Sequence, residues 1–330
     1  MSQNTNVAGL DVGTSRIVMA RQNGTAMEYH SQLNAFVCVP HTKMTEGALR
    51  REGIQFAAQG SELIVHGNDA PRFADLLHVE TRRPMVQGVL NPSETESVPV
   101  VRRIVQQMTS HGEGRPKVCF SVPSAALNGD EGLTYHEATL RQMFSELDYE
   151  VRSINEGLAV VYSELEETNY TGIGVSCGGG LCNVSLAYLS MPALSFSIPK
   201  AGDFIDSSTA SVTGDLANRV RLIKEENFHF NGHFVDKLHQ VLTVYYEDVI
   251  HALINGMKEA FSDTRRIPKL TKPIPMVLSG GTASPKGFRD RFEKILRESD
   301  FPIAISDVRV AKDPLTATAR GALIAAMTEM

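Results

Sequence analysis

The sequence lacks any long apolar segment. No apolar run approaches the roughly 20 residues that a helix needs to cross a bilayer. The N-terminal stretch MSQNTNV has neither the basic region nor the apolar core of a signal peptide, and it offers no apolar face for a lipid surface. We therefore expect a cytoplasmic protein that does not insert directly into a membrane.

Cysteine and clustered basic charge are also scarce. The four cysteines are Cys38, Cys119, Cys177 and Cys182. This thin distribution is typical of reduced thiols and not of a disulfide framework, and no pair has the spacing of zinc ligands. The formal net charge is -6 and the basic residues are scattered, whereas a nucleic-acid surface needs a basic stripe. We expect no nucleic-acid partner.

What the sequence does contain is an alternation of strand-like and helix-like segments. Apolar residues make up 42% of the 330 positions and charged residues 21%, which describes an ordinary globular protein large enough for two lobes. The segment 117–125 has the composition of a buried strand, and 134–148 carries apolar residues on one helical face. The terminal stretch DPLTATARGALIAAM is expected to be a tightly packed helix of small residues. This alternation predicts an α/β fold.

A weak internal repeat divides the chain into halves. The segments LDVGTSRIVMA, from Leu10, and VSCGGGLCNVSLA, from Val175, each read as a strand, a glycine turn and a second strand. We call them the first and second hairpins. Asp11 and Ser176 take equivalent places in them, about half the chain length apart. The repeat predicts a duplicated architecture in which a ligand binds between two glycine turns.

Five segments, in order along the chain, resemble those of a known superfamily. They are GLDVGTS, INEGLAVV, GVSCGGG, LSGGTASPKG and DPLTATARGA. In this order they resemble the first phosphate loop, first connecting helix, second phosphate loop, adenosine loop and second connecting helix of the actin, Hsp70 and sugar-kinase ATPases. MVQGVLNP and KAGDFID are most similar to stretches of the bacterial actins of the MreB and MamK type, whereas HEATLRQM is equally close to Hsp70.

The resemblance implies a two-lobed, ribonuclease H-like duplicated fold with a central nucleotide cleft. The first lobe would take residues 1–150, with 313–330 returning to it and about 30–80 forming a small inserted subdomain. The second lobe would take residues 151–312, with about 203–272 as its inserted subdomain. ATP or ADP, together with Mg²⁺, would bind between the lobes.

The first hairpin is expected to bind phosphate and metal. Its turn residues Gly13, Thr14 and Ser15 can direct backbone N–H groups and hydroxyls toward the β- and γ-phosphates. By resemblance, the carboxylate of Asp11 takes part in catalysis and holds Mg²⁺ through water. The residues alone also allow a simpler interpretation, because aspartate before glycine is common in turns.

The second hairpin departs from the superfamily. Its turn residues are Gly178, Gly179 and Gly180. These glycines can still cradle phosphate. Relatives carry an acid before the glycines, and here Ser176 takes that place. The loss of one electrostatic contact predicts weak ATP hydrolysis, or binding without hydrolysis. Asp203 or Asp206 could instead supply the missing charge.

The other matched segments supply the remaining site residues. By resemblance, Glu156 is the catalytic glutamate that orients the attacking water, although glutamate is also favoured in the first turn of any helix. Lys224 corresponds to a residue beside the adenine and ribose, although a lysine on a helix is more often solvated. The residues of the adenosine loop are Gly280, Gly281 and Thr282.

The resemblance implies a bacterial actin-like protein that binds ATP and assembles into cytoplasmic filaments, with slow or impaired hydrolysis. Its partners would be copies of itself, joined head to tail, and an unidentified cargo or adaptor. A monomeric Hsp70-like or regulatory nucleotide switch is the alternative, although the sequence leaves no room for a substrate-binding domain after the second connecting helix. A small-molecule kinase is the third reading, but no segment clearly provides a carboxylate for a substrate hydroxyl.

Overall fold

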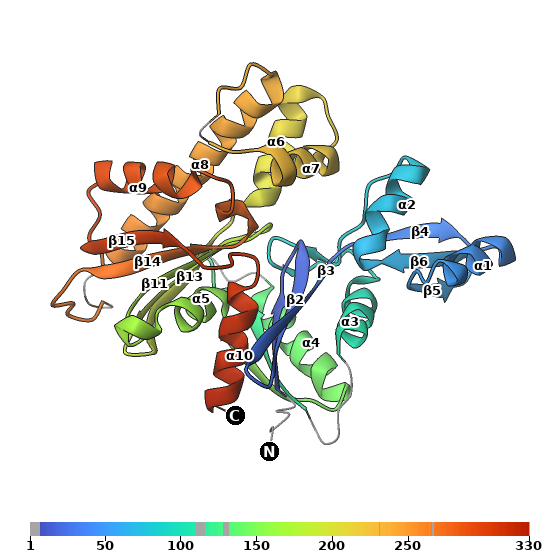
Figure 1. Ribbon diagram of the computed structural model, residues 1–330, viewed down its shortest axis with the longest axis horizontal. Helices are drawn as coiled ribbons and strands as arrows, with labels where there is room; N and C mark the ends of the chain where they lie inside the picture. The colour runs from blue at the N-terminus through green and yellow to red at the C-terminus, as the bar shows by residue number, and fades with distance from the viewer. Residues whose placement is uncertain are drawn as a thin grey trace.

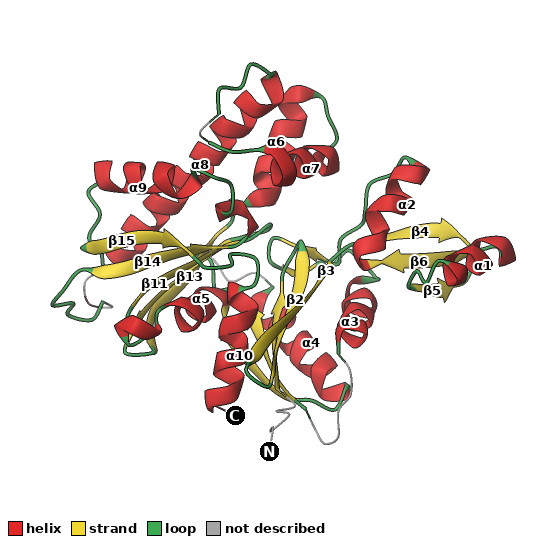
Figure 2. Cartoon of the chain, viewed as in Figure 1, coloured by secondary structure: helices red, strands yellow, loops and turns green. Residues whose placement is uncertain are grey.

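The computed structural model describes residues 7–109, 116–127, 132–230, 232–263, 265 and 267–329. The polar N-terminal residues 1–6 therefore lie outside the described part of the chain. Two five-stranded sheets, each with helices packed on its faces, make up most of the molecule, as Figure 1 and Figure 2 show. Within the described residues, no helix is both long and apolar enough to cross a membrane.

The two sheets share one topology. The first has the strand order β10-β9-β1-β2-β3, and the second has the order β13-β12-β11-β14-β15, which is the same order read from the other edge. In each sheet the central strand pairs antiparallel with the strand that follows it and parallel with a later one. This confirms the predicted α/β class and the internal repeat. The strands of the two sheets are β1 Val7–Val12, β2 Arg16–Asn23, β3 Ala26–Leu33, β9 Lys117–Val122, β10 Glu150–Asn155, β11 Gly172–Cys177, β12 Cys182–Tyr188, β13 Met191–Ile198, β14 Ile274–Ser279 and β15 Ile305–Val310.

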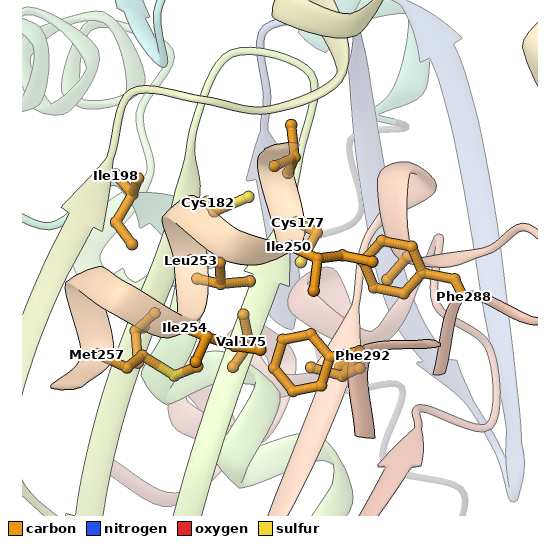
Figure 3. Close-up of a cluster of buried hydrophobic side chains, with 14 of the residues drawn as sticks. Val175, Cys177, Cys182, Ile198, Ile250, Leu253, Ile254, Met257, Phe288 and Phe292 are labelled. Carbon is orange, nitrogen blue, oxygen red and sulfur yellow. The ribbon is translucent and has the colours of Figure 1, made fainter. Parts of the chain in front are cut away.

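A large apolar core lies on one face of the second sheet. The helices of this lobe are α6 Gly202–Thr213, α7 Ala217–Asn227, α8 Lys237–Phe261 and α9 Phe288–Glu298. Side chains of α8 and α9 pack on β11, β12 and β14, and Figure 3 shows part of this cluster. All six residues of β11 are buried, as expected for a strand covered on both faces. Asp236 caps the N-terminus of α8, because its carboxylate accepts a hydrogen bond from the N–H of His239.

The first lobe has its own core and a peripheral extension. The other elements of this lobe are β4 Phe36–Pro40, α1 Lys43–Arg51, β5 Phe56–Gln59, β6 Glu62–His66, α2 Ala70–Leu77, β7 Met85–Val86, β8 Val89–Leu90, α3 Ser97–Met108 and α4 Leu133–Glu146. Side chains of α3 and α4, such as Ile104 and Phe144, pack with Leu10 of β1 and Phe120 of β9. The small sheet β4-β6-β5, with α1 and α2, projects to one side (Figure 1). The exact limits of lobes and subdomains remain a prediction.

Two helices cross between the lobes. They are α5 Glu156–Glu164 and α10 Ala317–Glu329. The helix α5 follows the first-lobe strand β10 but packs on β11 and β12, whereas α10 follows the second-lobe strand β15 but packs on β1. A Cβ atom at Gly9 of β1 would lie 2.1 Å from the backbone nitrogen of Leu323. One at Gly174 of β11 would lie 2.2 Å from the carbonyl oxygen of Gly157. Each helix therefore lies directly on the backbone of a central strand.

The crossing helices also touch each other through small residues. A Cβ atom at Gly321 of α10 would lie 1.8 Å from the carbonyl oxygen of Ala159 in α5. Buried alanines of both helices, among them Ala322 and Ala325, share one core cluster with Val277 of β14. This confirms the prediction that the terminal small-residue segment packs tightly as a helix.

Gly321→Ala is expected to destabilise the protein, because the added methyl group would overlap a backbone carbonyl that cannot move aside alone. We expect the free energy of unfolding to fall by at least about 2 kcal/mol. Gly47→Ala is the matched control, since Gly47 also lies in a helix but has open space at its Cβ position. That change should raise stability by up to about 1 kcal/mol. Urea unfolding measures both effects, and equal stabilities of the two variants would contradict the close helix contact.

Candidate functional site

A cavity of about 670 Å³ opens between the two lobes. This volume is within the range of roughly 300–1000 Å³ that is typical of small-molecule and cofactor sites. Both glycine hairpins line it, together with α6, α7 and the segment that follows β14. The structure brings all residues predicted for the site to this cavity. They are Asp11, Gly13, Thr14, Ser15, Glu156, Gly178, Gly179, Gly180, Lys224, Gly280, Gly281 and Thr282.

The two hairpins close in the same way. The N–H of Gly13 donates to the carbonyl of Arg16 at 3.0 Å, and the N–H of Gly178 donates to the carbonyl of Leu181 at 3.0 Å. These two glycines therefore use their amides to close the turn and do not offer them to phosphate. Four other amides make no hydrogen bond with any residue that the structure describes, so they can receive an anion. They belong to Thr14, Ser15, Gly179 and Gly180.

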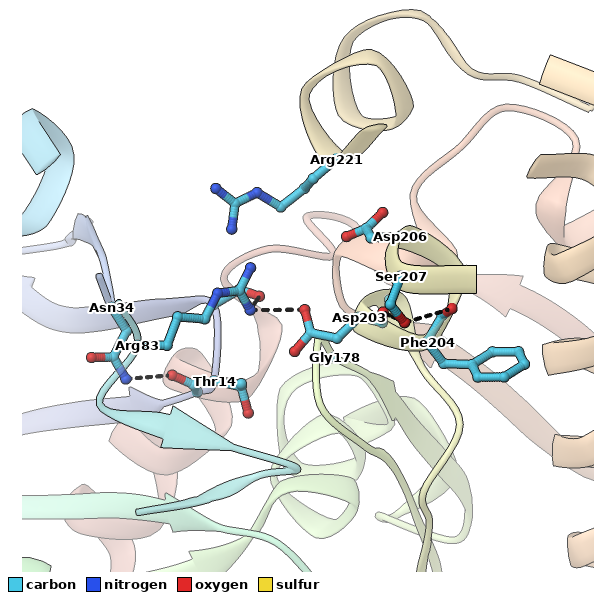
Figure 4. Close-up of polar contacts among 12 residues, drawn as sticks. Thr14, Asn34, Arg83, Gly178, Asp203, Phe204, Asp206, Ser207 and Arg221 are labelled. Carbon is cyan, nitrogen blue, oxygen red and sulfur yellow. Dashed lines mark hydrogen bonds and ion pairs between the residues drawn. The ribbon is translucent and has the colours of Figure 1, made fainter. Parts of the chain in front are cut away.

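Neighbouring residues hold the first hairpin in place. The hydroxyl oxygen of Thr14 accepts a hydrogen bond from the N–H of Gly88 at 3.0 Å. The hydroxyl oxygen of Ser15 accepts one from Arg83 at 3.3 Å. The side-chain amide of Asn34 donates to the carbonyl of Gly13 at 2.9 Å (Figure 4). The hairpin is thus held by the protein itself, as a preorganised phosphate site requires.

The hairpins of the two lobes meet at contact distance. A Cβ atom at Gly179 would lie 2.2 Å from Oγ of Ser15, and one at Gly180 would lie 2.5 Å from Oγ1 of Thr14. A larger residue at either position would push the hairpins apart. The glycines therefore allow one ligand to contact the backbones of both lobes.

Asp11 lies near the end of β1 and faces the cavity. Its Oδ1 accepts a hydrogen bond from the hydroxyl of Ser121 at 2.7 Å. Burial raises the pKa of Asp11 to about 6, and the hydrogen bond from Ser121 opposes this rise. A cation beside this carboxylate would therefore be favourable, because it would stabilise the charged form.

The donor set fits a magnesium ion that arrives with a nucleotide. Among the described residues, no group of three or more His, Cys, Asp or Glu side chains could hold a metal by itself. Mg²⁺ in nucleotide sites usually takes one or two carboxylates, phosphate oxygens and several waters. Asp11 can supply such a carboxylate from the cavity wall.

Glu156 is the first residue of α5, and only 9% of its surface is exposed. Its Oε2 accepts hydrogen bonds from the hydroxyl of Ser176 and from the side-chain amide of Asn183, both at 3.0 Å. Burial, followed by the charge of Asp11, raises the pKa of Glu156 to about 8, whereas the two hydrogen bonds lower it. Ser176 therefore bonds directly to the glutamate that the sequence predicts to be catalytic.

The segment predicted to be the adenosine loop begins where β14 ends. The N–H of Gly280 donates to the carbonyl of Pro314 at 2.8 Å. The hydroxyl of Thr282 donates to the carbonyl of Gly178 at 2.7 Å, which ties this loop to the second hairpin. Gly281 lines the same cavity between these two contacts. This segment and the second hairpin therefore form one continuous wall of the cavity.

The two aspartates that could replace the missing acid are both paired with cations. Asp206 lies 2.7 Å from the ammonium group of Lys224, and both side chains are buried. The interpretation of Lys224 as a solvated helix lysine is therefore wrong. Asp203 pairs with Arg83 of the first lobe at 2.8 Å (Figure 4). The protein itself compensates the negative charge of both aspartates.

Two ion pairs connect the lobes across the cleft. Arg83 bonds to Asp203, and Arg16 at the start of β2 lies 3.1 Å from Glu225 of α7. All four side chains are partly exposed, so each pair contributes only about 0–1 kcal/mol. Such contacts can break when the lobes move apart.

Sequence reasoning missed Ser121, Arg83 and Asn183. For Asn183 a signal was available, because a hairpin with this turn sets Asn183 directly opposite Ser176, with both side chains on one face. Ser121 and Arg83 gave no comparable signal. Ser121 meets Asp11 across 110 positions of sequence, and Arg83 meets Asp203 across 120.

The raised pKa of Glu156 predicts that, without nucleotide and metal, the contribution of this residue to stability falls as the pH rises. Between pH values of about 4.5 and about 8, folded Glu156 keeps a proton that it has released in the unfolded chain. Its contribution therefore declines across this window and levels off above it. Glu156→Gln cannot ionise, so its advantage over wild type should grow with pH and reach at least about 1 kcal/mol at the upper end.

Thermal melting in the presence of a chelator, between about pH 5 and about pH 9, measures this effect. Glu150→Gln is the control, because Glu150 is an exposed carboxylate of the neighbouring strand β10. An advantage of Glu156→Gln that stays constant with pH, or that Glu150→Gln shares, would contradict the buried, protonated state of Glu156.

Comparison with known proteins identifies one family and several structural neighbours. A sequence model of the Volactin family matches residues 7–326. No curated protein matches the chain. Among solved structures, the MamK double helical filament has 18% identity and a TM-score of 0.74, and the match covers 98% of this chain and 99% of that one. MreB5 of Spiroplasma citri bound to ADP has 15% identity and a TM-score of 0.68, with 98% and 96% covered.

The ethanolamine utilization protein EutJ from Carboxydothermus hydrogenoformans is also similar, with 16% identity, a TM-score of 0.56 and coverage of 96% and 88%. These neighbours agree with the overall fold described above. The chain therefore has the two-lobed actin-like fold predicted from its five segments. Because the family match spans nearly all of its residues, this chain belongs to the Volactin family.

Proposed function

We propose that this chain is an actin-like protein that binds ATP or ADP, assembles with copies of itself into filaments, and hydrolyses ATP slowly. The observation that carries the proposal is the cavity between two equivalent glycine hairpins. Similarity to a MamK filament supports self-assembly, and similarity to ADP-bound MreB5 supports nucleotide binding.

The residues of the cavity suit a triphosphate. The unpaired amides of the two turns would bind the phosphate oxygens. Asp11 would hold Mg²⁺ through water, and the bound ion would supply positive charge against the phosphates. The adenosine loop and Lys224 would line the nucleoside end. Glu156 would orient the attacking water with the carboxylate oxygen that Ser176 and Asn183 do not engage.

Slow hydrolysis follows from the neutral residue at position 176. Ser176 adds no negative charge to the site, and its hydroxyl donates a hydrogen bond to Glu156. Asp206 is paired with the buried Lys224, and Asp203 is paired with Arg83, so a cation of the protein compensates the charge of each nearby aspartate. One well-placed electrostatic contact is commonly worth about 3 kcal/mol, or roughly a hundredfold in rate. A filament of this protein would therefore stay in the ATP-bound state longer than one whose sites carry the full set of acids.

Assembly would proceed head to tail, because contacts between unlike faces of identical subunits do not close and can extend into a filament. We further propose a cytoplasmic location and a cargo or adaptor that the filament organises.

A monomeric nucleotide switch is the second candidate. The weak ion pairs Arg83–Asp203 and Arg16–Glu225 across the cleft favour it, because lobes held this lightly can open and close with nucleotide.

Asp11→Ala is expected to weaken ATP binding at least about tenfold, because the metal would lose its protein carboxylate while the phosphates keep their charge. Calorimetric titration with Mg-ATP measures the change. Asp290→Ala, which removes an exposed aspartate from α9, is the control and should bind like wild type. Unchanged affinity in Asp11→Ala would contradict the assignment of the cleft.

ATP is expected to produce sedimentable polymer at micromolar protein. Pelleting with ATP, with ADP and without nucleotide tests this, and Asp11→Ala serves as the variant with impaired binding. Protein that binds ATP but stays monomeric by light scattering, across salt and temperature, would support the switch over the filament.

A further inference from the structure

Glu156 is held by one oxygen of its carboxylate. Its Oε2 accepts both hydrogen bonds, from Ser176 and from Asn183. Its Oε1 makes no hydrogen bond with any described residue, and the side chain lines the cavity. One carboxylate oxygen is therefore anchored, and the other remains for a ligand or a water.

The two donors to Glu156 are themselves held in fixed orientations. Asn183 is 1% exposed, and its Oδ1 accepts a hydrogen bond from the backbone N–H of Ser124 at 2.8 Å. This contact determines which end of the amide faces Glu156, because only the NH₂ end can donate to a carboxylate. Ser176 is 4% exposed and stands directly opposite Asn183 in the β11–β12 pair. Both donors therefore come from paired strands of a sheet, which are rigid supports.

Both lobes take part in this arrangement. Ser124 follows β9 of the first sheet, Asn183 belongs to β12 of the second, and Glu156 begins the helix that crosses between them. A backbone N–H, an amide, a carboxylate and a hydroxyl thus form one chain of hydrogen bonds around the glutamate. No acid occupies position 176, so the two neighbours of the carboxylate both act as donors.

We propose that Ser176 and Asn183 are positioning residues for ATP hydrolysis, which hold Glu156 so that its second oxygen orients the attacking water. The inference rests on the proposed function and adds the residues that make the glutamate effective. Water would attack the γ-phosphorus as the bond to the β,γ-bridging oxygen breaks, which yields ADP, inorganic phosphate and a proton. A group that orients the attacking nucleophile must itself be held in place, because small misplacements of it are costly in rate.

The test compares two quantities in the full chain with Mg-ATP: the single-turnover rate of phosphate release and the affinity for ATP. The single variants are Ser176→Ala, Ser176→Thr, Asn183→Ala and Glu156→Ala. A double variant combines Ser176→Ala with Asn183→Ala. Ser195→Ala is the matched control, because it removes a hydrogen bond of 2.7 Å to Ser185 on the same sheet.

We expect Ser176→Ala and Asn183→Ala to slow phosphate release by about tenfold to a hundredfold, with ATP affinity within about threefold of wild type. Ser176→Thr keeps the hydroxyl and should keep most of the rate. The double variant should release phosphate as slowly as Glu156→Ala, since both would lack an oriented glutamate. Ser195→Ala should match wild type in both measurements.

Three results would overturn the inference. These are unchanged release in both single variants, losses of rate that only follow losses of affinity, and wild-type release no faster than that of Glu156→Ala. If one of these results is obtained while the wild type still binds ATP and assembles, only the positioning role fails. Absence of ATP binding by the wild type would defeat the proposed function and this inference together.

Discussion

The structure depends on two helices that lie directly on the backbone of the central strands. Gly9 and Gly174 leave no side chain between strand and helix, and Gly321 lets the two helices touch through Ala159. Because each helix follows one sheet and packs on the other, these contacts set the distance between the lobes. The hairpins at the ends of the same strands then face each other, and the cavity opens beside their contact. A methyl group at any of these glycines would change the distance on which the site is built.

The same closeness explains the electrostatics of the site. Asp11 and Glu156 are brought into one buried space, and burial raises the pKa of each. Without a bound metal, a third carboxylate at position 176 would place another negative charge directly beside Glu156. The serine instead donates a hydrogen bond to it, as does Asn183, so serine in place of the expected acid removes a charge and supplies a donor. The second hairpin is therefore a glycine turn whose first strand supports the glutamate.

The cleft combines rigid and breakable parts. The hairpins are held by hydrogen bonds, among them a buried one from Gly88 to Thr14 and a partly buried one from Thr282 to Gly178. The lobes are also bridged by partly exposed ion pairs, which contribute little and respond to salt. A nucleotide could therefore change the separation of the lobes without rearranging the turns that we propose bind it. Such lobe movement is compatible with a subunit of a filament and with a monomeric switch, which is why assembly has to be measured directly.

Local features of the chain were readable from the sequence alone. The glycine turns and the strand alternation depend on residues close together in the chain, and the repeat that relates Asp11 to Ser176 compares two such local patterns, so the α/β class and the duplicated fold could be predicted. The resemblance of five segments to a superfamily added which residues would line the cavity. The partners of those residues could not. The burial of Lys224, the bond from Ser121 to Asp11 and the two donors on Glu156 join segments far apart in sequence. Hydrogen bonds and burial depend on distances that arise only when the helices cross between the sheets. The tertiary structure alone therefore decided that Ser176 is a donor to the glutamate and not merely the absence of an acid.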